Sequence, residues 1–120
     1  MARMTWQVDF YEEEDGSAPV EDFLSGLPVH HRAKALALVR LLEEMGPALP
    51  YPYASQVRGK IRELRTQYAK DNIRNLYLGD SRRCFVLLHG LVKRTEKLRE
   101  GDIRVAEDRM QKHNKKVERS

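Results

Sequence analysis

A run of five apolar residues, Cys84 to Leu88, constrains the fold of this chain more than any other feature. A strand exposed on one side alternates polar and apolar residues, so an uninterrupted apolar run is typical of a central strand covered on both faces. His89 and Gly90 are expected to end this strand. With 120 residues, about the modal size of one domain, the chain is expected to form a single domain, 1–120, around it.

Three further segments alternate polar and apolar residues, as half-buried strands do. They are Trp6–Phe10, Lys60–Thr66 and Asn72–Leu78. Gly79 to Ser81 predicts a turn that leads into the apolar run. The chain therefore contains four predicted strands, three of them consecutive.

Two helices are predicted after the first strand. Ser17 is a candidate N-cap for a short helix that Gly26 ends, and a longer helix is expected from Pro28 to about Met45. Gly46 and Pro47 are expected to terminate it. The prolines from position 47 to position 52 predict an extended connector, because proline fixes φ and disfavours helix at the residue before it.

A final helix is predicted from about Asp102 to Asn114, with residues 115–120 as a frayed tail. The order of strand, two helices, three strands and helix predicts an α+β fold. Two N-terminal helices would pack on a small, mostly antiparallel sheet, with a third helix at the C-terminus. Only the connection through the first two helices is long enough to join parallel strands.

Several classes of site are excluded by composition. Cys84 is the single cysteine, so neither an intramolecular disulfide nor a multi-thiolate zinc site can form. No glycine-rich phosphate loop is present, and the adjacent His30 and His31 diverge by about 100° on a helix. We therefore expect no metal and no cofactor. Without a membrane-length apolar run or a secretory signal, the chain is expected to be cytoplasmic and to have no membrane partner.

Charge is distributed unevenly along the chain. Residues 1–55 carry four Lys and Arg against nine Asp and Glu, whereas residues 56–120 carry eighteen against nine. The second half therefore has a net charge of +9 and the first half −5. A strongly basic half of a folded domain indicates either a polyanionic partner or a solvated charged surface.

Cations on the predicted strands, and in the segment after them, are candidates for a shared anion site. Such a cluster would hold phosphates through charge and bidentate hydrogen bonds. RNA carries its own nucleophile, the 2′-hydroxyl, so the cluster would also support metal-free cleavage by stabilising a charged phosphorane. The alternative for Arg65 and Arg74 is cross-strand pairing with Glu63 or Asp71. The candidate cations are Lys60, Arg62, Arg65, Arg74, Lys93, Arg94, Lys97 and Arg99.

Over about residues 6–112 the chain resembles the phage-derived HigB/RelE-like toxins of type II toxin–antitoxin modules. The stretch Leu87-Leu88-His89-Gly90, followed by the basic segment Lys93-Arg94-Thr95-Glu96-Lys97, is its most specific part. The other stretches that carry the resemblance are Trp6 to Tyr11, Ser17 to Leu24, Pro52-Tyr53, Glu63 to Arg65, Arg74 to Tyr77 and Asp102 to Ala106.

The resemblance implies a RelE-like fold and, for many members, metal-free cleavage of mRNA in the ribosomal A site. It implies that Arg65 and Arg74 contact phosphate and that Lys93 and Arg94 are the basic pair after the last strand, with Arg94 stabilising the phosphorane. Arg74, Arg94 and Lys93 are thus the expected catalytic residues.

The remaining cations are expected to bind RNA: Lys60, Arg62, Arg65, Lys97 and Arg99. His89 is either a proton carrier or a packed strand-end histidine. The chain departs from RelE in having Ile61 and Glu63 where RelE has two lysines. It also has Leu98-Arg99 where close relatives usually have Thr-Pro, and the general base and acid stay unassigned.

The function expected from the sequence is that of a ribosome-dependent mRNA endonuclease toxin. Its expected partners are the ribosome, mRNA and a HigA-like antitoxin, for which the apolar stripe of the helix at 28–45 is a candidate surface. The alternatives are a ParE-like toxin that poisons DNA gyrase without cleaving nucleic acid, and a nucleic-acid-binding regulator.

Overall fold

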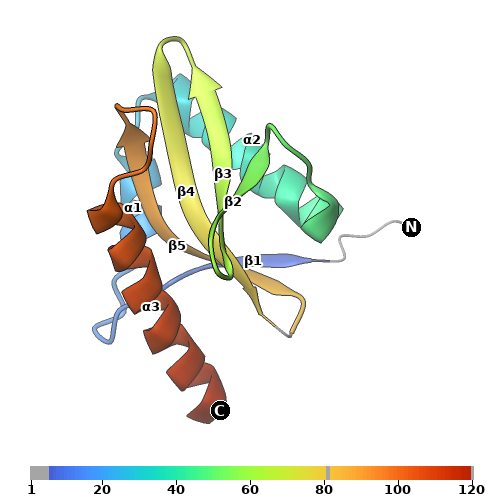
Figure 1. The fold of residues 1–120 in the computed structure, drawn as a ribbon, viewed down its shortest axis with the longest axis vertical. Coiled ribbons are helices and arrows are strands. Elements are labelled where there is room, and N and C mark those ends of the chain that lie inside the picture. Colours follow the sequence, from blue (N-terminus) through green and yellow to red (C-terminus); the bar gives the residue numbers. More distant parts are fainter. Residues whose placement is uncertain (1–5, 81, 120) are drawn as a thin grey trace.

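The computed structural model describes residues 6–80 and 82–119, and its sheet has five strands in the order β1-β5-β4-β3-β2 (Figure 1). The strand bounds are β1 Gln7–Phe10, β2 Ala54–Arg58, β3 Ile61–Tyr68, β4 Asp71–Asp80 and β5 Cys84–Lys93. β5 lies between β1 and β4, and residues Cys84 to Leu88 are all buried. The prediction of a central strand from the apolar run is therefore confirmed.

The sheet is mixed because of one strand pair. β2 to β5 form antiparallel pairs, whereas β1 runs parallel to β5, with Gln7 opposite Cys84 and Phe10 opposite Leu87. The parallel pair thus joins strands from opposite ends of the chain. The connection through the helices leads instead from β1 to β2 at the other edge of the sheet.

Helices cover the two faces of the sheet unequally. Helix α1 (Pro19–Ser25) and helix α2 (Val29–Met45) pack on one face, where Leu42, Leu64 and Leu87 belong to the same buried cluster. Helix α3 (Glu100–Arg119) packs on the other face, against a cluster that includes Leu88. Figure 1 shows that α3 lies over the lower part of this face, so the part beside the β3–β4 turn has no helix over it.

The α+β class agrees with the expectation, but the helix ends and connectors differ in detail. Ser17 does not cap α1; its Oγ donates a hydrogen bond of 2.7 Å to Asp15, and Ala18 stands at the N-cap. Gly46 ends α2 with φ +59°, as a glycine terminator should. The connector after α2 begins with a 3-10 turn, Gly46–Ala48, rather than an extended segment.

Two strand predictions were wrong. β2 was missed, and β5 does not end at His89 and Gly90 but continues to Lys93. The pairing of β5 with β4 continues through Lys93, with a register shift between Leu76 and Tyr77. Gly90 fits there because a Cβ atom would collide with Phe23, so the missing side chain makes room for the α1 ring.

The C-terminal helix is longer than expected, since α3 begins at Glu100 and runs through Arg119. Lys116, in the predicted tail, donates a hydrogen bond of 2.7 Å to the Glu12 carbonyl and lies over the Tyr11 ring. These contacts hold the end of α3 against the segment that follows β1. The predicted turn at Gly79 to Ser81 was wrong for its first two residues, since Gly79 and Asp80 belong to β4. Ser81, residues 1–5 and Ser120 lie outside the described residues. Within the described part of the chain, no helix is long and apolar enough to cross a membrane.

Candidate functional site

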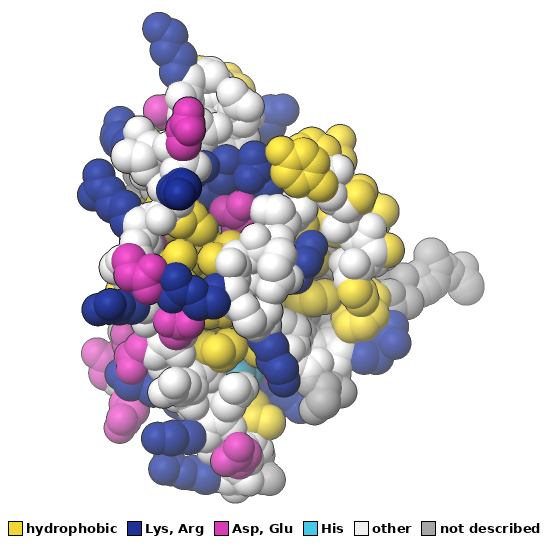
Figure 2. Space-filling model, viewed as in Figure 1, with side chains coloured by type: hydrophobic (Ala, Val, Ile, Leu, Met, Phe, Trp, Pro, Cys, Tyr) yellow, Lys and Arg dark blue, Asp and Glu magenta, His cyan; other side chains and the backbone are white. Residues whose placement is uncertain are grey.

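Four of the predicted site residues meet at the uncovered end of the sheet. Arg65 on β3, Arg74 on β4, Lys93 at the end of β5 and Arg94 directly after it line one hollow of about 610 Å³, here called the basic groove. Its other lining residues are Lys70, Asp71, Asn72, Thr95 and Glu96. Figure 2 shows Lys and Arg side chains gathered on the upper part of this face.

The period of the strands explains this convergence. Arg65 is the ladder partner of Arg74, and Leu91 is the partner of Arg74 on the other side. Lys93 stands two residues beyond Leu91, so its side chain points to the same face as Leu91 and Arg74. The sequence prediction that sequence-distant cations converge on one face is confirmed for these positions.

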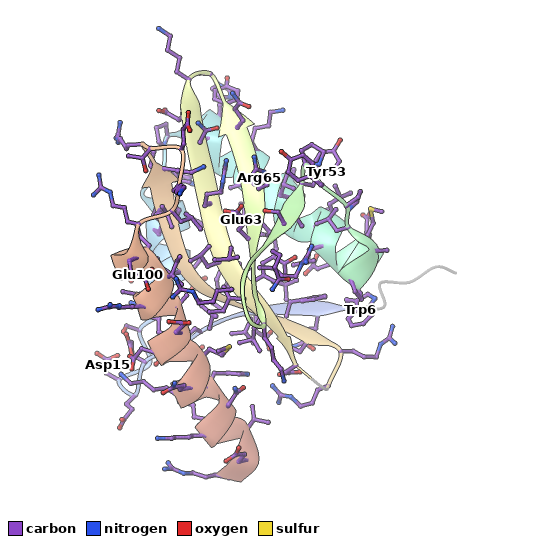
Figure 3. The ribbon with its side chains drawn as sticks, in the orientation of Figure 1. Trp6, Asp15, Tyr53, Glu63, Arg65 and Glu100 are labelled. Atoms are coloured by element: carbon purple, nitrogen blue, oxygen red, sulfur yellow. The ribbon has the colours of Figure 1, made fainter. Side chains whose placement is uncertain are left out.

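Glu63 is a carboxylate that pairs with two of these cations, Arg65 and Arg74, and it lies close to Arg65 in Figure 3. Its side chain is buried, and its Oε2 accepts hydrogen bonds from Arg65 Nη1 at 3.1 Å and from Ser55 Oγ at 2.6 Å. Its Oε1 forms an ion pair of 3.4 Å with Arg74 Nε that lacks hydrogen-bond geometry. The cross-strand pairing considered from the sequence is therefore present between Arg74 and Glu63, whereas Arg65 pairs with Glu63 along the same strand. Asp71 pairs with His31.

Arg74 is the deepest cation of the groove, with only 4% of its surface exposed. Burial, and then repulsion from Arg65, lower the pKa of Arg74, although Glu63 opposes both. A guanidinium stays protonated even so. Its Nη1 donates to the Ile73 carbonyl at 3.1 Å. Arg74 is thus a fixed positive charge held by strand and carboxylate.

Lys93 and Arg94 differ from Arg74 in being accessible. Lys93 is half-buried and Arg94 is exposed. Within residues 6–80 and 82–119, no hydrogen bond or ion pair engages either side chain. These two cations can therefore contact an anion without first breaking a contact within the protein.

A second hollow, of about 290 Å³, adjoins the groove and is lined by Lys97, Arg99 and Asp102 together with Lys93 and Arg94. Asp102 holds the predicted proton carrier, since His89 Nε2 lies 2.7 Å from Asp102 Oδ1. His89 itself lines neither hollow. Lys97 and Arg99 thus extend the cationic surface away from Arg74.

Lys60 and Arg62 are not part of this surface. Lys60 is exposed in the turn between β2 and β3, at the end of β3 far from Arg65. Arg62 faces the opposite side of the sheet from Arg65, opposite Tyr77, and donates to Gln56 Oε1 at 3.3 Å. The structure therefore does not bring these two predicted RNA-binding residues to the groove.

Two tyrosines were not predicted as part of the site. Tyr51 lies under the Arg65 guanidinium, 5.1 Å from ring centroid to Cζ, and Tyr53 lies beside Arg65 (Figure 3). The two tyrosines on either side of Pro52 are visible in the sequence and indicate an aromatic surface in this connector. Their position relative to Arg65 depends on β2, which the sequence pattern did not predict.

The site offers no obvious metal centre. Among the residues that the structure describes, no group of three or more His, Cys, Asp or Glu side chains is placed to hold a metal ion.

Cys84 is buried, and its thiol donates a hydrogen bond to Asp9 Oδ2 at 3.1 Å. Burial, and then that contact, raise the pKa of the thiol to about 12. A thiol with such a pKa is not a nucleophile at neutral pH.

These features define a small α+β protein with a cationic groove across three consecutive antiparallel strands. The chain belongs to the family of phage-derived Gp49-like proteins (DUF891), whose model matches residues 22–111. This family is toxin-like and related to the RelE and ParE type, and membership suggests an antitoxin partner. Comparison with curated proteins gives no match.

Proposed function

We propose that the chain is the toxin of a type II toxin–antitoxin module and acts as a ribosome-dependent mRNA endonuclease. The observation that carries the proposal is the convergence of Arg65, Arg74, Lys93 and Arg94 on one open groove. The proposal includes a HigB-like identity and inhibition by a HigA-like antitoxin. Residues 1–120 would act as a single domain in the cytoplasm.

The charge of the groove supports a nucleic acid as substrate. Its lining contains five cationic and two acidic side chains. Lys97 and Arg99 continue the positive surface beside Arg94, which suits a chain of phosphates better than a single small anion. Cations that neutralise phosphates supply most of the affinity for single-stranded RNA and make it depend on salt.

The proposed reaction uses the 2′-hydroxyl of the RNA itself. The 2′-oxygen forms a bond to phosphorus, its proton leaves to a base, and the bond from phosphorus to the 5′-oxygen breaks as that oxygen takes up a proton. The products are a 2′,3′-cyclic phosphate and a 5′-hydroxyl. No metal or cofactor takes part in this scheme.

The chain's cations would stabilise the negative charge of the phosphorane. Arg94 and Lys93 are accessible and can contact the phosphate directly, while Arg74 supplies a fixed charge from the floor of the groove. Fixed charges in a preorganised site need no rearrangement during the reaction, and such groups typically contribute about 10²–10³ in rate. Glu63 acts as a positioning residue, because it holds the guanidiniums of Arg65 and Arg74.

His89 is the candidate proton carrier, and its alternative is a packed strand-end histidine, since it lines neither hollow. Its Nε2 is held by Asp102, an arrangement that fixes the ring and its tautomer and leaves Nδ1 as the other site for a proton. The contact between His89 and Asp102 would equally connect β5 to α3 if His89 had no role in proton transfer. Replacing His89 with glutamine separates the two roles, since a lost proton carrier slows cleavage about 10²–10⁴-fold while RNA binding persists.

A reconstituted translation reaction tests the proposal. New mRNA 5′ ends are mapped with and without ribosomes for the wild-type protein and for the double variant Lys93→Ala/Arg94→Ala. Lys60→Ala is the matched control, because it also removes a surface cation but lies outside the groove. We expect the wild-type protein to cut mRNA only when ribosomes are present. The Lys60→Ala protein should cut in the same way, and the double variant should not cut. Equal cutting by all three proteins would refute the assignment of the groove.

A second function is favoured by one observation. Glu63 already pairs with Arg65 and Arg74, and a neutralised cluster of this kind would also serve a ParE-like toxin that inhibits DNA gyrase without cleaving nucleic acid. That function predicts intact mRNA in the translation reaction and a block of DNA supercoiling by purified gyrase. A nucleic-acid-binding regulator would show salt-dependent binding with neither effect.

A further inference from the structure

A pocket of about 260 Å³ opens beside the basic groove, at the edge of β3 that extends beyond β2. Arg65, Asn72 and Arg74 line both hollows, so the two spaces share a wall. The volume lies just below the range of about 300–1,000 Å³ found for drug-sized ligands. It suits a planar fragment of the size of a nucleobase.

The side of this pocket towards α2 is aromatic and apolar. Tyr53 and Pro52 from the connector face Leu38 of α2 across it. Tyr53 is 44% exposed and Tyr51, beside it, is 70% exposed. Exposed tyrosines next to a phosphate-binding arginine provide the flat surfaces on which unpaired bases stack.

The backbone holds this aromatic surface in a fixed relation to the cations. The amide of Arg65 donates a hydrogen bond of 2.8 Å to the Tyr53 carbonyl, and the Arg65 guanidinium lies over the Tyr51 ring. Any phosphate bound by Arg65 is therefore adjacent to both rings. A single nucleotide unit can place its phosphate in the groove and its base in the pocket.

The remaining wall of the pocket is polar and available. It is formed by Gln67, Asn72 and Lys34. In the described part of the chain, no side-chain hydrogen bond or ion pair engages any of the three. Two carboxamides and an ammonium can donate to and accept from the edges of a base, which is how proteins distinguish bases in single-stranded RNA.

We propose that this pocket, with Tyr53 as its stacking surface and Gln67 and Asn72 at its edge, binds one nucleobase next to the phosphate held by Arg65 and Arg74. The inference rests on the proposed function, because it assumes an RNA substrate. It assigns the choice of base to the β3–β4 edge and the connector before β2. The cations of the groove contact only the backbone of the RNA.

Binding of short RNA to the full-length protein tests this subsite. Fluorescein-labelled pentanucleotides are titrated by anisotropy at low salt, in parallel with an oligomer of the same length in which every base is removed. The variants are Tyr53→Ala, Tyr53→Phe and Leu36→Ala, the last being a matched control with similar exposure on the outer side of α2. Thermal unfolding of each variant reports whether it is folded.

We expect Tyr53→Ala to weaken binding of the base-containing RNA by roughly 5- to 150-fold, the range for loss of one stacked base. Its affinity for the abasic oligomer should stay the same, and Tyr53→Phe and Leu36→Ala should bind both as the wild type does. Equal effects of Tyr53→Ala on both oligomers, or none, would overturn the subsite and leave the nuclease proposal standing. If the wild-type protein binds the abasic oligomer as tightly as the base-containing RNA, the pocket holds no base and the subsite is overturned, whatever the translation reaction shows.

Discussion

The carboxylate of Glu63 on β3 faces the guanidinium of Arg74 on β4, with 3.4 Å between Oε1 and Nε, and both side chains are buried. Arg65 and Ser55 occupy the other carboxylate oxygen. Two of the arginines that line the groove are thus paired with one buried carboxylate. This charge fixes two arginines and at the same time reduces the attraction of the groove for anions.

Glu63→Gln should therefore separate binding from chemistry. Removing the negative charge raises the positive potential of the groove, and we expect RNA to bind tighter, roughly 2- to 10-fold at low salt. Cleavage should fall, because Arg65 and Arg74 lose the group that orients them. Oligonucleotide titration and mapping of 5′ ends measure the two effects on one sample. Weaker binding together with unchanged cleavage would contradict this role of Glu63.

Arg74→Ala should destabilise the fold by about 2–4 kcal/mol, because it leaves a buried carboxylate with fewer partners. The double variant Glu63→Ala/Arg74→Ala should recover part of this loss, since it removes both charges. Urea unfolding of the wild type, the two single variants and the double variant gives the coupling free energy. A coupling near zero would show that the 3.4 Å contact contributes nothing to stability.

The accessible cations should act through salt-dependent binding. Loss of two phosphate contacts in Lys93→Ala/Arg94→Ala should reduce the slope of log affinity against log salt by about 1.4 for single-stranded RNA. The free energy of unfolding should change little, because neither side chain makes a hydrogen bond or ion pair among the described residues. An unchanged salt slope would remove these residues from the binding surface.

Gly90→Ala and Gly101→Ala should change stability in opposite directions. A Cβ at Gly90 would overlap the Phe23 ring and lie 2.9 Å from Asn75 Oδ1, and we expect a loss of about 1–3 kcal/mol from overpacking. A Cβ at Gly101 meets nothing within 4 Å, and alanine favours the helix by up to about 1 kcal/mol. Thermal unfolding measures both. A stable Gly90→Ala protein would mean that α1 does not pack on β5 as described.

Asp80 should make the free energy of unfolding decrease as the pH falls into the acidic range. Burial tends to raise the pKa of Asp80, but hydrogen bonds from Arg82 and His113 outweigh it and lower the pKa below 3.8. The ionised carboxylate therefore contributes stability above pH 4, and this contribution is lost as the pH falls through the lowered pKa. Asp80→Asn should cost about 1 kcal/mol at pH 7 and less at pH 3 in urea unfolding.

The predictable part of the site is the part that depends on strand period alone. Arg65, Arg74 and Lys93 lie on strands whose alternation is visible in the sequence, and the structure places them on one face. Lys60 and Arg62 were included because they are cations on the same predicted strand. Their exclusion follows from where β3 begins and from which face Arg62 occupies.

The rest of the site depends on contacts between distant segments. β2, Ala54–Arg58, has little β-branched or aromatic character and becomes a strand by pairing with β3. Without β2, Tyr53 could not be placed beside Arg65. The role of Glu63 likewise requires the register of β3 on β4, which brings its carboxylate within reach of Arg74.

The parallel pairing of β1 with β5 also has a consequence for synthesis of the protein. Residues 7–10 have their partners at 84–87. β1 therefore cannot pair within the sheet until β5 has been synthesised. Chains fold as they emerge from the ribosome, starting at the N-terminus. The groove is completed only by Lys93 and Arg94. A protein whose proposed target is the translating ribosome thus gains its phosphate-binding surface only after Arg94 has been added to the growing chain.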